Sequence, residues 1–242
     1  MFNLNIASQQ LSFKELHMRY PRFRVADMEK SNIVTNMFRK KNIPYPPESI
    51  FLRIFKEEQT IELWAKSENL NTYSYMKKYN FCAFSGKLGP KRKEGDLQIP
   101  EGYYFINRFN PQSSHYLSLG INYPNTLDQL AGNKGMLGGD IFIIGNCVSW
   151  GCIPIGQNNI KELYLIIVDT YSYNKKMISV HIYPNKMNLS NFNLLKNQFQ
   201  NNHNLISFWD NLKDGYIFFE QNHILPIIEI DKKNIKYKFI NR

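Results

Sequence analysis

Cysteine is scarce in this 242-residue sequence, which contains only Cys82, Cys147 and Cys152. Three cysteines are too few for the disulfide framework of a small secreted scaffold. Cys147 and Cys152 lie five residues apart, and no nearby cysteine or histidine completes a four-ligand zinc set. The sequence therefore predicts no disulfide framework and no bound metal, and it gives no sign of another cofactor.

Long hydrophobic runs are also missing. No stretch approaches the roughly 20 apolar residues of a transmembrane helix, so we expect no membrane-spanning segment. Residues 1–10 lack a basic region followed by an apolar one, so no secretion signal is visible. Two alternatives follow: either the protein stays inside the cell, or the sequence lacks its export segment.

The composition does provide a core and a positive charge. Hydrophobic residues make up 43% of the sequence and aromatic residues 14%, which is enough for a folded domain. The net charge of +10 favours polyanionic partners such as nucleic acid, an anionic membrane or an acidic wall polymer. The densest basic runs, 39–41 and 91–93, are three residues each, and no nucleic-acid-binding motif accompanies them. We therefore expect no nucleic-acid partner.

The hydrophobic pattern divides the chain into three parts, at 1–47, 48–185 and 186–242. Residues 11–41 are expected to be helical with an interruption at Pro21, and Val25, Met28, Met37 and Phe38 to form an apolar stripe. The proline-rich run 44–47 is typical of an extended linker. The middle part is β-rich, with strands expected at 50–55, 60–65, 79–85, 102–107, 116–121, 140–145 and 177–183.

One helix interrupts this β-rich part. Apolar residues from Ile160 to Val168 recur at helical spacing, and Asn158 or Asn159 is the expected N-cap. The last part, from Asn188, is predicted to contain a helix and short strands at 227–230 and 235–239.

The run DIFIIGNCVSWGCIPI at 140–155 joins the expected strand to this helix. A catalytic cysteine reacts as thiolate and needs partial exposure together with a base or a positive potential. Gly151 permits a sharp turn directly before Cys152, and backbone N–H groups around such a turn can stabilise an oxyanion. The alternative interpretation is a small buried cysteine beside a helix start.

Ser149-Trp150-Gly151-Cys152 resembles the S-x-G-C signature of the L,D-transpeptidase catalytic domain, and the run C-V-S-x-G-C from Cys147 is similar to an extended branch of that family. Further runs agree in order with the same branch, at 85–92, 95–102, 117–125 and 180–184. The likeness extends from about residue 12 to the C-terminus and is dense between 85 and 185. The chain is thereby identified as a member of that family.

The resemblance implies an α+β protein. Its catalytic domain would be mainly β, of sandwich or barrel-like form, with one helix after the cysteine motif and helical extensions at both ends. It also implies a cysteine enzyme that attacks the third residue of peptidoglycan stem peptides and expels the terminal D-residue. An amine, from another stem or from a lipoprotein lysine, or water would then take the acyl group. The cell envelope or periplasm would be its location.

Carried onto this sequence, the resemblance makes Cys152 the nucleophile. Gly151 and the backbone of Cys152 would surround the oxyanion, and Ser149 would hydrogen-bond a catalytic imidazole. Gly145 corresponds to the glycine that closes the preceding strand.

The family has a histidine directly before that glycine, whereas this chain has Ile144. Isoleucine accepts no proton, and general-base assistance is typically worth about 10²–10⁴-fold in rate. Three explanations stay open: an inactive, peptidoglycan-binding or regulatory homologue, another histidine that reaches the thiol, or an error or engineered change in the sequence. Within the catalytic region the histidines are His115 and His181, and the alternative for each is a polar-face residue without a catalytic role. Ile144 and Phe142 are expected to share a core-facing strand face.

Cys147 permits one further hypothesis. It would pair with Cys152 in an oxidising compartment and block the nucleophile, provided that the two Cα atoms come within the ~4.4–6.8 Å of a disulfide. The alternative is a packed, unpaired cysteine.

Overall fold

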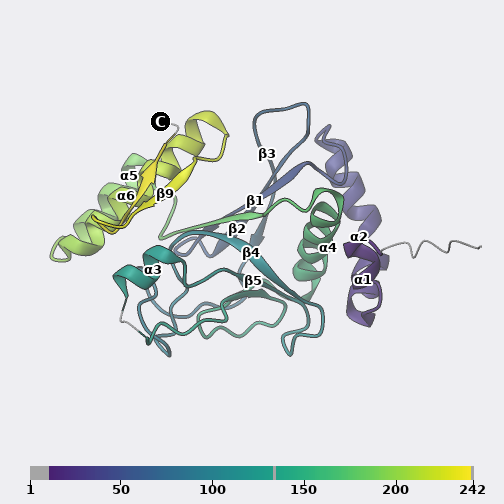
Figure 1. Cartoon of the computed structure of the whole chain (residues 1–242), viewed down its shortest axis with the longest axis horizontal. Helices are drawn as coiled ribbons and strands as arrows, with labels where there is room; N and C mark the ends of the chain where they lie inside the picture. Colours follow the sequence, from purple (N-terminus) through teal and green to yellow (C-terminus); the bar gives the residue numbers. More distant parts are fainter. Residues whose placement is uncertain (1–10, 133–134, 241–242) are drawn as a thin grey trace, which may run out of the picture.

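A computed structural model describes residues 11–132 and 135–240. Its centre is one curled sheet of eight strands in the order β3-β2-β1-β8-β4-β5-β6-β7. The strands are β1 (Ser49–Phe55), β2 (Thr60–Lys66), β3 (Ser74–Asn80), β4 (Gly102–Asn110), β5 (Ser118–Ile121), β6 (Phe142–Ile144), β7 (Ile153–Pro154) and β8 (Ser179–Tyr183). Figure 1 shows the sheet between two groups of helices. The α+β class and the barrel-like curvature of the sheet are thereby confirmed.

Two strand pairings join runs that are neighbours in sequence, whereas β8 pairs with β1 and β4 from a distant part of the chain. β1 and β2 form an antiparallel hairpin in which Ile54 lies opposite Ile61, and β8 returns parallel to β1. β4 crosses to β8 and then pairs with β5, so it links the two halves of the sheet. Most residues of β1 and β2 are buried, as expected for strands covered on both faces.

Helices α1 (Phe13–His17) and α2 (Pro21–Lys40) pack against α4 (Gln157–Asn174), the helix that follows the cysteine motif (Figure 1). Pro21 begins α2 at a position where its missing N–H costs no helical hydrogen bond. The buried face of α2 includes Phe23, Ala26, Val34 and Phe38, whereas Met28 is 77% exposed. The predicted stripe was therefore wrong at Met28.

The C-terminal part contains α5 (Leu189–Gln198), α6 (His203–Asn222) and a separate hairpin of β9 (Ile228–Asp231) and β10 (Lys236–Phe239). It packs on the sheet through a second apolar cluster that includes Phe55, Tyr183 and Trp209. A buried ion pair supports this contact: Lys56 Nζ lies 3.0 Å from Glu101 Oε1, and Glu101 Oε2 accepts a hydrogen bond from Trp209 Nε1. The division at 47 and 185 stays a prediction.

Several boundaries differ from the sequence prediction. The third strand lies at Ser74–Asn80 instead of 79–85, and the helix after the motif begins at Gln157 with Gly156 as N-cap. The short helix α3 (Thr126–Ala131) was missed, although Asn125 and Asp128 form a reciprocal capping box there. Phe142 is only half-buried, so the expected core face holds for Ile144 but not for Phe142.

Candidate active site around Cys152

The cysteine motif is a loop held between two neighbouring strands. β6 and β7 pair in parallel, with Ile143 opposite Ile153 and Ile144 opposite Pro154. The Ile155 N–H donates to the Ile144 carbonyl at 3.0 Å. Because the two strands are parallel, residues 145–152 leave at the end of β6 and run back to the opposite end of the pair, where β7 begins. Cys152, directly before β7, therefore lies beside the residues that lead into β6.

The Cys152 thiol is half-buried and forms no disulfide. Its Sγ donates to the Asp140 carbonyl at 3.7 Å. Burial raises the pKa of the Cys152 thiol, and the negative charge of Asp140 acts in the same direction. The Phe142 backbone N–H and the positive charge of Lys91 oppose this rise only in part. The thiol is therefore predominantly protonated at neutral pH.

Gly151 has a φ of +95°, a left-handed conformation that favours glycine. A Cβ at this position would lie 2.8 Å from the Gln98 carbonyl oxygen, so the turn also needs glycine for space. Its N–H donates to Ser85 Oγ at 2.9 Å. The N–H that was predicted to surround an oxyanion thus already has an acceptor.

Ser149 contacts hydroxyl and carbonyl groups instead of an imidazole. Its Oγ donates to the Cys152 carbonyl at 2.7 Å and lies 2.8 Å from Ser85 Oγ. Ser85 Oγ in turn reaches the Leu97 carbonyl at 2.9 Å. The two hydroxyls have two protons to share among these three contacts, so the proton positions are correlated. Through Ser149 and the Cys152 carbonyl, the pair holds the turn on both sides of Gly151.

Gly145 serves close packing. Its N–H donates to the His115 carbonyl at 3.1 Å, and a Cβ would lie 2.7 Å from Ile160 Cγ2 on α4. Before it, Ile144 is 1% exposed and lies opposite Ser118 of β5. The residue at the family's histidine position is therefore a buried sheet residue.

His181 is buried on β8 among aromatic rings. Its ring centroid lies 4.6 Å from those of Phe51 and Tyr103, and Nδ1 contacts Tyr183 Oη at 3.3 Å. Burial and the nearby Arg53 charge lower the pKa of His181 to about 3. It is thus a neutral core histidine beneath the C-terminal helices.

His115 lies in the turn before β5, where its carbonyl accepts the Gly145 N–H. Its Nδ1 is buried and has no hydrogen-bond partner in the part of the chain that the structure describes. No histidine contributes to the pKa shift of Cys152, and no hydrogen bond joins a described histidine to Sγ. Among the described residues, neither His115 nor His181 forms a hydrogen bond with the thiol, so a catalytic role for either histidine stays a prediction.

The disulfide of this protein joins Cys82 to Cys147, with Cα atoms 5.2 Å apart, and leaves Cys152 free. The hypothesis of a Cys147–Cys152 pair was wrong, because Cys147 already has a partner 65 residues away in sequence. The Cys82 N–H also donates to the Pro154 carbonyl at 3.0 Å. The segment after β3 thus holds the motif loop through Cys82 and, three residues later, through Ser85. Sequence reasoning assigned neither residue a role.

The loop that carries Cys152 exposes two apolar side chains. Val148 is 47% exposed and Trp150 is 78% exposed, on the loop that carries Cys152. None of the principal clefts in residues 11–132 and 135–240 is lined by Cys152.

Over residues 11–132 and 135–240, no group of three or more metal-binding side chains was found, and no helix has the length and hydropathy to cross a membrane.

No family model matches the sequence, but a known protein is similar enough to identify the family. The Escherichia coli K12 protein "Putative L,D-transpeptidase YafK" is 32% identical over 183 residues, which cover 75% of this chain and 70% of YafK.

Two solved structures are more distant. One is the K307A variant of the helical cell shape determining protein Pgp2 from Campylobacter jejuni, with 22% identity, a TM-score of 0.46 and coverage of 57% of this chain and 47% of Pgp2. The other is an L,D-transpeptidase from Xylanimonas cellulosilytica, with 17% identity, a TM-score of 0.29 and coverage of 58% and 63%. The assignment rests on the similarity to YafK: this chain belongs to the L,D-transpeptidase family.

Proposed function

We propose that this protein transfers acyl groups of peptidoglycan stem peptides through a thioester on Cys152. The observation that carries the proposal is a free, half-buried thiol in a turn that four hydroxyl and backbone contacts hold in place. A nucleophile held in one geometry loses less entropy on reaching the transition state. Family membership supplies the substrate class.

The proposed reaction has two steps. The Cys152 thiolate attacks the carbonyl carbon of the third stem residue, the S–C bond forms, and the C–N bond to the terminal D-residue breaks. The departing amine takes up one proton. An acceptor amine, or water in an amidase reaction, then attacks the thioester and returns the thiol. A lipoprotein lysine is one such amine, and the cell envelope is the place where these partners occur.

The side chains around the turn take roles that follow from their contacts. Ser149 holds the Cys152 carbonyl, and Gly151 supplies its N–H to the oxyanion if the substrate displaces Ser85 Oγ. Trp150 offers an exposed ring beside the reacting carbonyl. With Ile144 at the base position, the first step depends on the small thiolate fraction, so acylation is expected to be slow.

A second candidate function is a non-catalytic peptidoglycan-binding or regulatory homologue. Three observations favour it: the raised pKa of Cys152, Ile144 in place of the histidine, and the lack of a cleft lined by Cys152 among the principal clefts of the described residues. In this function the turn would be retained for binding alone.

A carbapenem distinguishes the two candidates, because opening of its β-lactam ring by a thiol leaves a stable adduct. We expect the intact mass of the protein to rise by one carbapenem, slowly and to completion, with the adduct on the peptide that contains Cys152. The Cys152→Ala variant is the control. No adduct after prolonged incubation, with binding to wall fragments retained, would support the binding homologue.

A further inference from the structure

A second cleft lies on the C-terminal part of the molecule, away from Cys152. It has a volume of about 770 Å³ and opens between the 89–92 run, α3, the first turns of α6 and the β9–β10 hairpin. Its walls are well supported. Lys56 Nζ donates to the Gly89 carbonyl at 2.7 Å, the Gly89 N–H donates to Glu101 Oε1 at 2.7 Å, and both Lys56 and Glu101 are fully buried.

The lining of this cleft is basic and rich in amides. No aspartate or glutamate lines it, whereas Arg92, Lys236, four asparagines and Ser207 do. Leu130 and Ile235 add exposed apolar surface, 40% and 44% exposed. A ligand with carboxylates, backbone amides and small apolar side chains would match these groups.

Arg92 and Lys236 differ in the contacts that they already make within the protein. Arg92 Nη1 lies 3.3 Å from Asp128 Oδ1, and its guanidinium lies over the Phe208 ring at 5.4 Å, which fixes its direction. Lys236 is exposed on β10, where it lies opposite Asp231, and its charge acts on that carboxylate. Because its side chain is exposed, Lys236 can also reach a ligand in the cleft that it lines.

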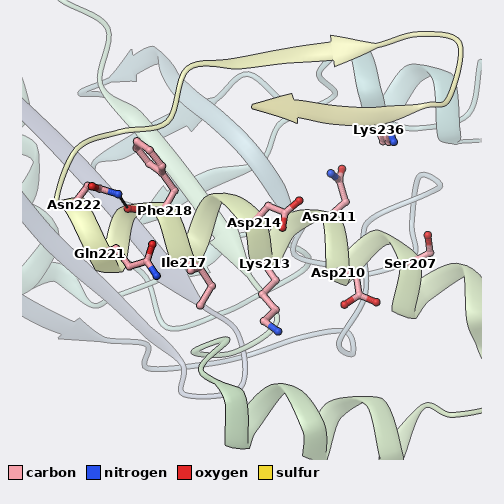
Figure 2. Close-up of a pocket in the computed structure, with 10 residues that line it drawn as sticks. All are labelled: Ser207, Asp210, Asn211, Lys213, Asp214, Ile217, Phe218, Gln221, Asn222 and Lys236. Carbon is pink, nitrogen blue, oxygen red and sulfur yellow. Dashed lines mark hydrogen bonds between the residues drawn. The ribbon is translucent and has the colours of Figure 1, made fainter. Parts of the chain in front are cut away.

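A neighbouring hollow along α6 does not have the basic, amide-rich lining of this cleft. Figure 2 shows Asp210 and Asp214 beside Lys213 on the helix, with Ser207 and Lys236 towards one end. Acidic and basic side chains offset each other along that face. The positive, amide-rich surface is thus confined to the end of α6 that meets Arg92.

The 89–98 segment connects the cleft with the cysteine motif. Arg92 lines the cleft, the preceding Lys91 lowers the pKa of Cys152 through its charge, and the Gln98 carbonyl contacts Gly151. A polymer bound along this segment could occupy both places.

We propose that the cleft between Arg92 and Lys236 binds an acidic peptide, namely a second stem peptide that Cys152 does not attack. This inference rests on the proposed function for its choice of peptide. Lys236 and Arg92 bind its carboxylates, the asparagine side chains bind its amides, and Leu130 and Ile235 contact its alanine methyl groups. The enzyme would thereby hold a neighbouring stem of the same wall while Cys152 acts.

The test uses the full chain with Cys152→Ala and the tripeptide L-alanyl-γ-D-glutamyl-meso-diaminopimelate. Binding is followed by NMR at the backbone amides of Asn204 and Ser207 for the cleft and of Gly151 for the motif. We expect saturable shifts at Asn204 and Ser207, weakened about fivefold by Lys236→Gln. The matched control Lys238→Gln, two residues along the same strand, should leave the affinity unchanged. A peptide with amidated carboxylates should bind at least fivefold more weakly.

Each of the following results would overturn the proposal: no shifts at Asn204 and Ser207, equal affinities of the two lysine variants, or equal binding of the amidated peptide. Displacement by glycan strands without peptides would do the same, because the cleft would then recognise sugar. Carbapenem acylation of the protein with Cys152 intact is read separately. Its failure would remove the proposed function, whereas successful acylation of the parent protein, with no cleft binding by the Cys152→Ala protein that keeps Lys236, would remove only this inference.

Discussion

Ser85 Oγ accepts a hydrogen bond from the Gly151 N–H at 2.9 Å, although the two residues lie 66 positions apart in sequence. Ser85 also contacts Ser149 Oγ, which holds the Cys152 carbonyl. The geometry of the cysteine turn therefore depends on the segment that follows β3. A buried donor that loses its acceptor costs about 1–3 kcal/mol, so this dependence can be measured.

Replacing Ser85 by alanine should loosen the turn. We expect Ser85→Ala to slow acylation of Cys152 by a carbapenem about tenfold and to change the pH profile of its alkylation by iodoacetamide. Ser85→Thr keeps the hydroxyl and should restore most of the rate. If the alanine variant reacts as fast as the parent or faster at every pH, Ser85 does not position the nucleophile and only competes with the oxyanion for the Gly151 N–H.

Reducing the Cys82–Cys147 disulfide should destabilise the protein and release the same loop. The bond closes a segment of 65 residues, and bonds of this kind typically contribute about 2–4 kcal/mol. The double variant Cys82→Ser with Cys147→Ser should therefore unfold at lower urea concentration than the parent. Urea titration of parent and variant, each with and without reductant, measures the effect. If the reductant destabilises the double variant as much as the parent, the loss of stability on reduction does not come from the Cys82–Cys147 disulfide.

His181 should make the fold sensitive to acid. Its pKa is lowered from 6.5 to about 3 in the folded protein, so the unfolded chain takes up the proton first as the pH falls. The stability that the neutral ring provides is therefore present above pH 6.5 and is lost between about pH 6.5 and 3. In His181→Phe, the free energy of unfolding should fall by several kcal/mol less than in the parent over this pH range. Acylation of Cys152 should be unchanged. Urea unfolding at pH 7, 6, 5 and 4 measures the difference in stability, and parallel curves would show that His181 has no such role.

Restoring the family's histidine should activate the thiol. Ile144→His places an imidazole on the strand whose Phe142 N–H already contacts the sulfur, and an adjacent imidazolium lowers a thiol pKa. We expect alkylation by iodoacetamide at pH 7 to accelerate at least tenfold. Ile144→Leu is the size-matched control. Equal rates in the two folded variants would mean that position 144 does not face the sulfur.

The sequence predicted those features that depend on neighbouring residues. The hairpin of β1 and β2 has apolar runs separated by a four-residue turn, and the helix after the motif has a regular apolar spacing, so both were expected. The short helix α3 lies below the length at which periodicity is visible. The third strand was misplaced because residues 81–85, which follow it, are also apolar in part but pair only through single contacts such as that of Cys82 with Pro154.

The site was predictable only as far as its motif. Cys152 and Gly151 lie within one run of residues, and Gly151 has the positive φ that its place before the nucleophile suggested. Ser85 and Cys82 could not be assigned, because their contacts with the loop join segments more than 60 residues apart. The burial of His181 depends on rings from β1, β4 and the C-terminal helices, and no local pattern shows that.

The central claim, that Cys152 takes the acyl group of a stem peptide, is tested most directly with a soluble stem tetrapeptide and mass spectrometry. We predict a thioester of the shortened tripeptide on Cys152 and release of one terminal D-residue per thioester, neither of which occurs with Cys152→Ala. No thioester and no released residue, from protein whose Cys152 iodoacetamide still alkylates and which still binds the tetrapeptide, would contradict the claim.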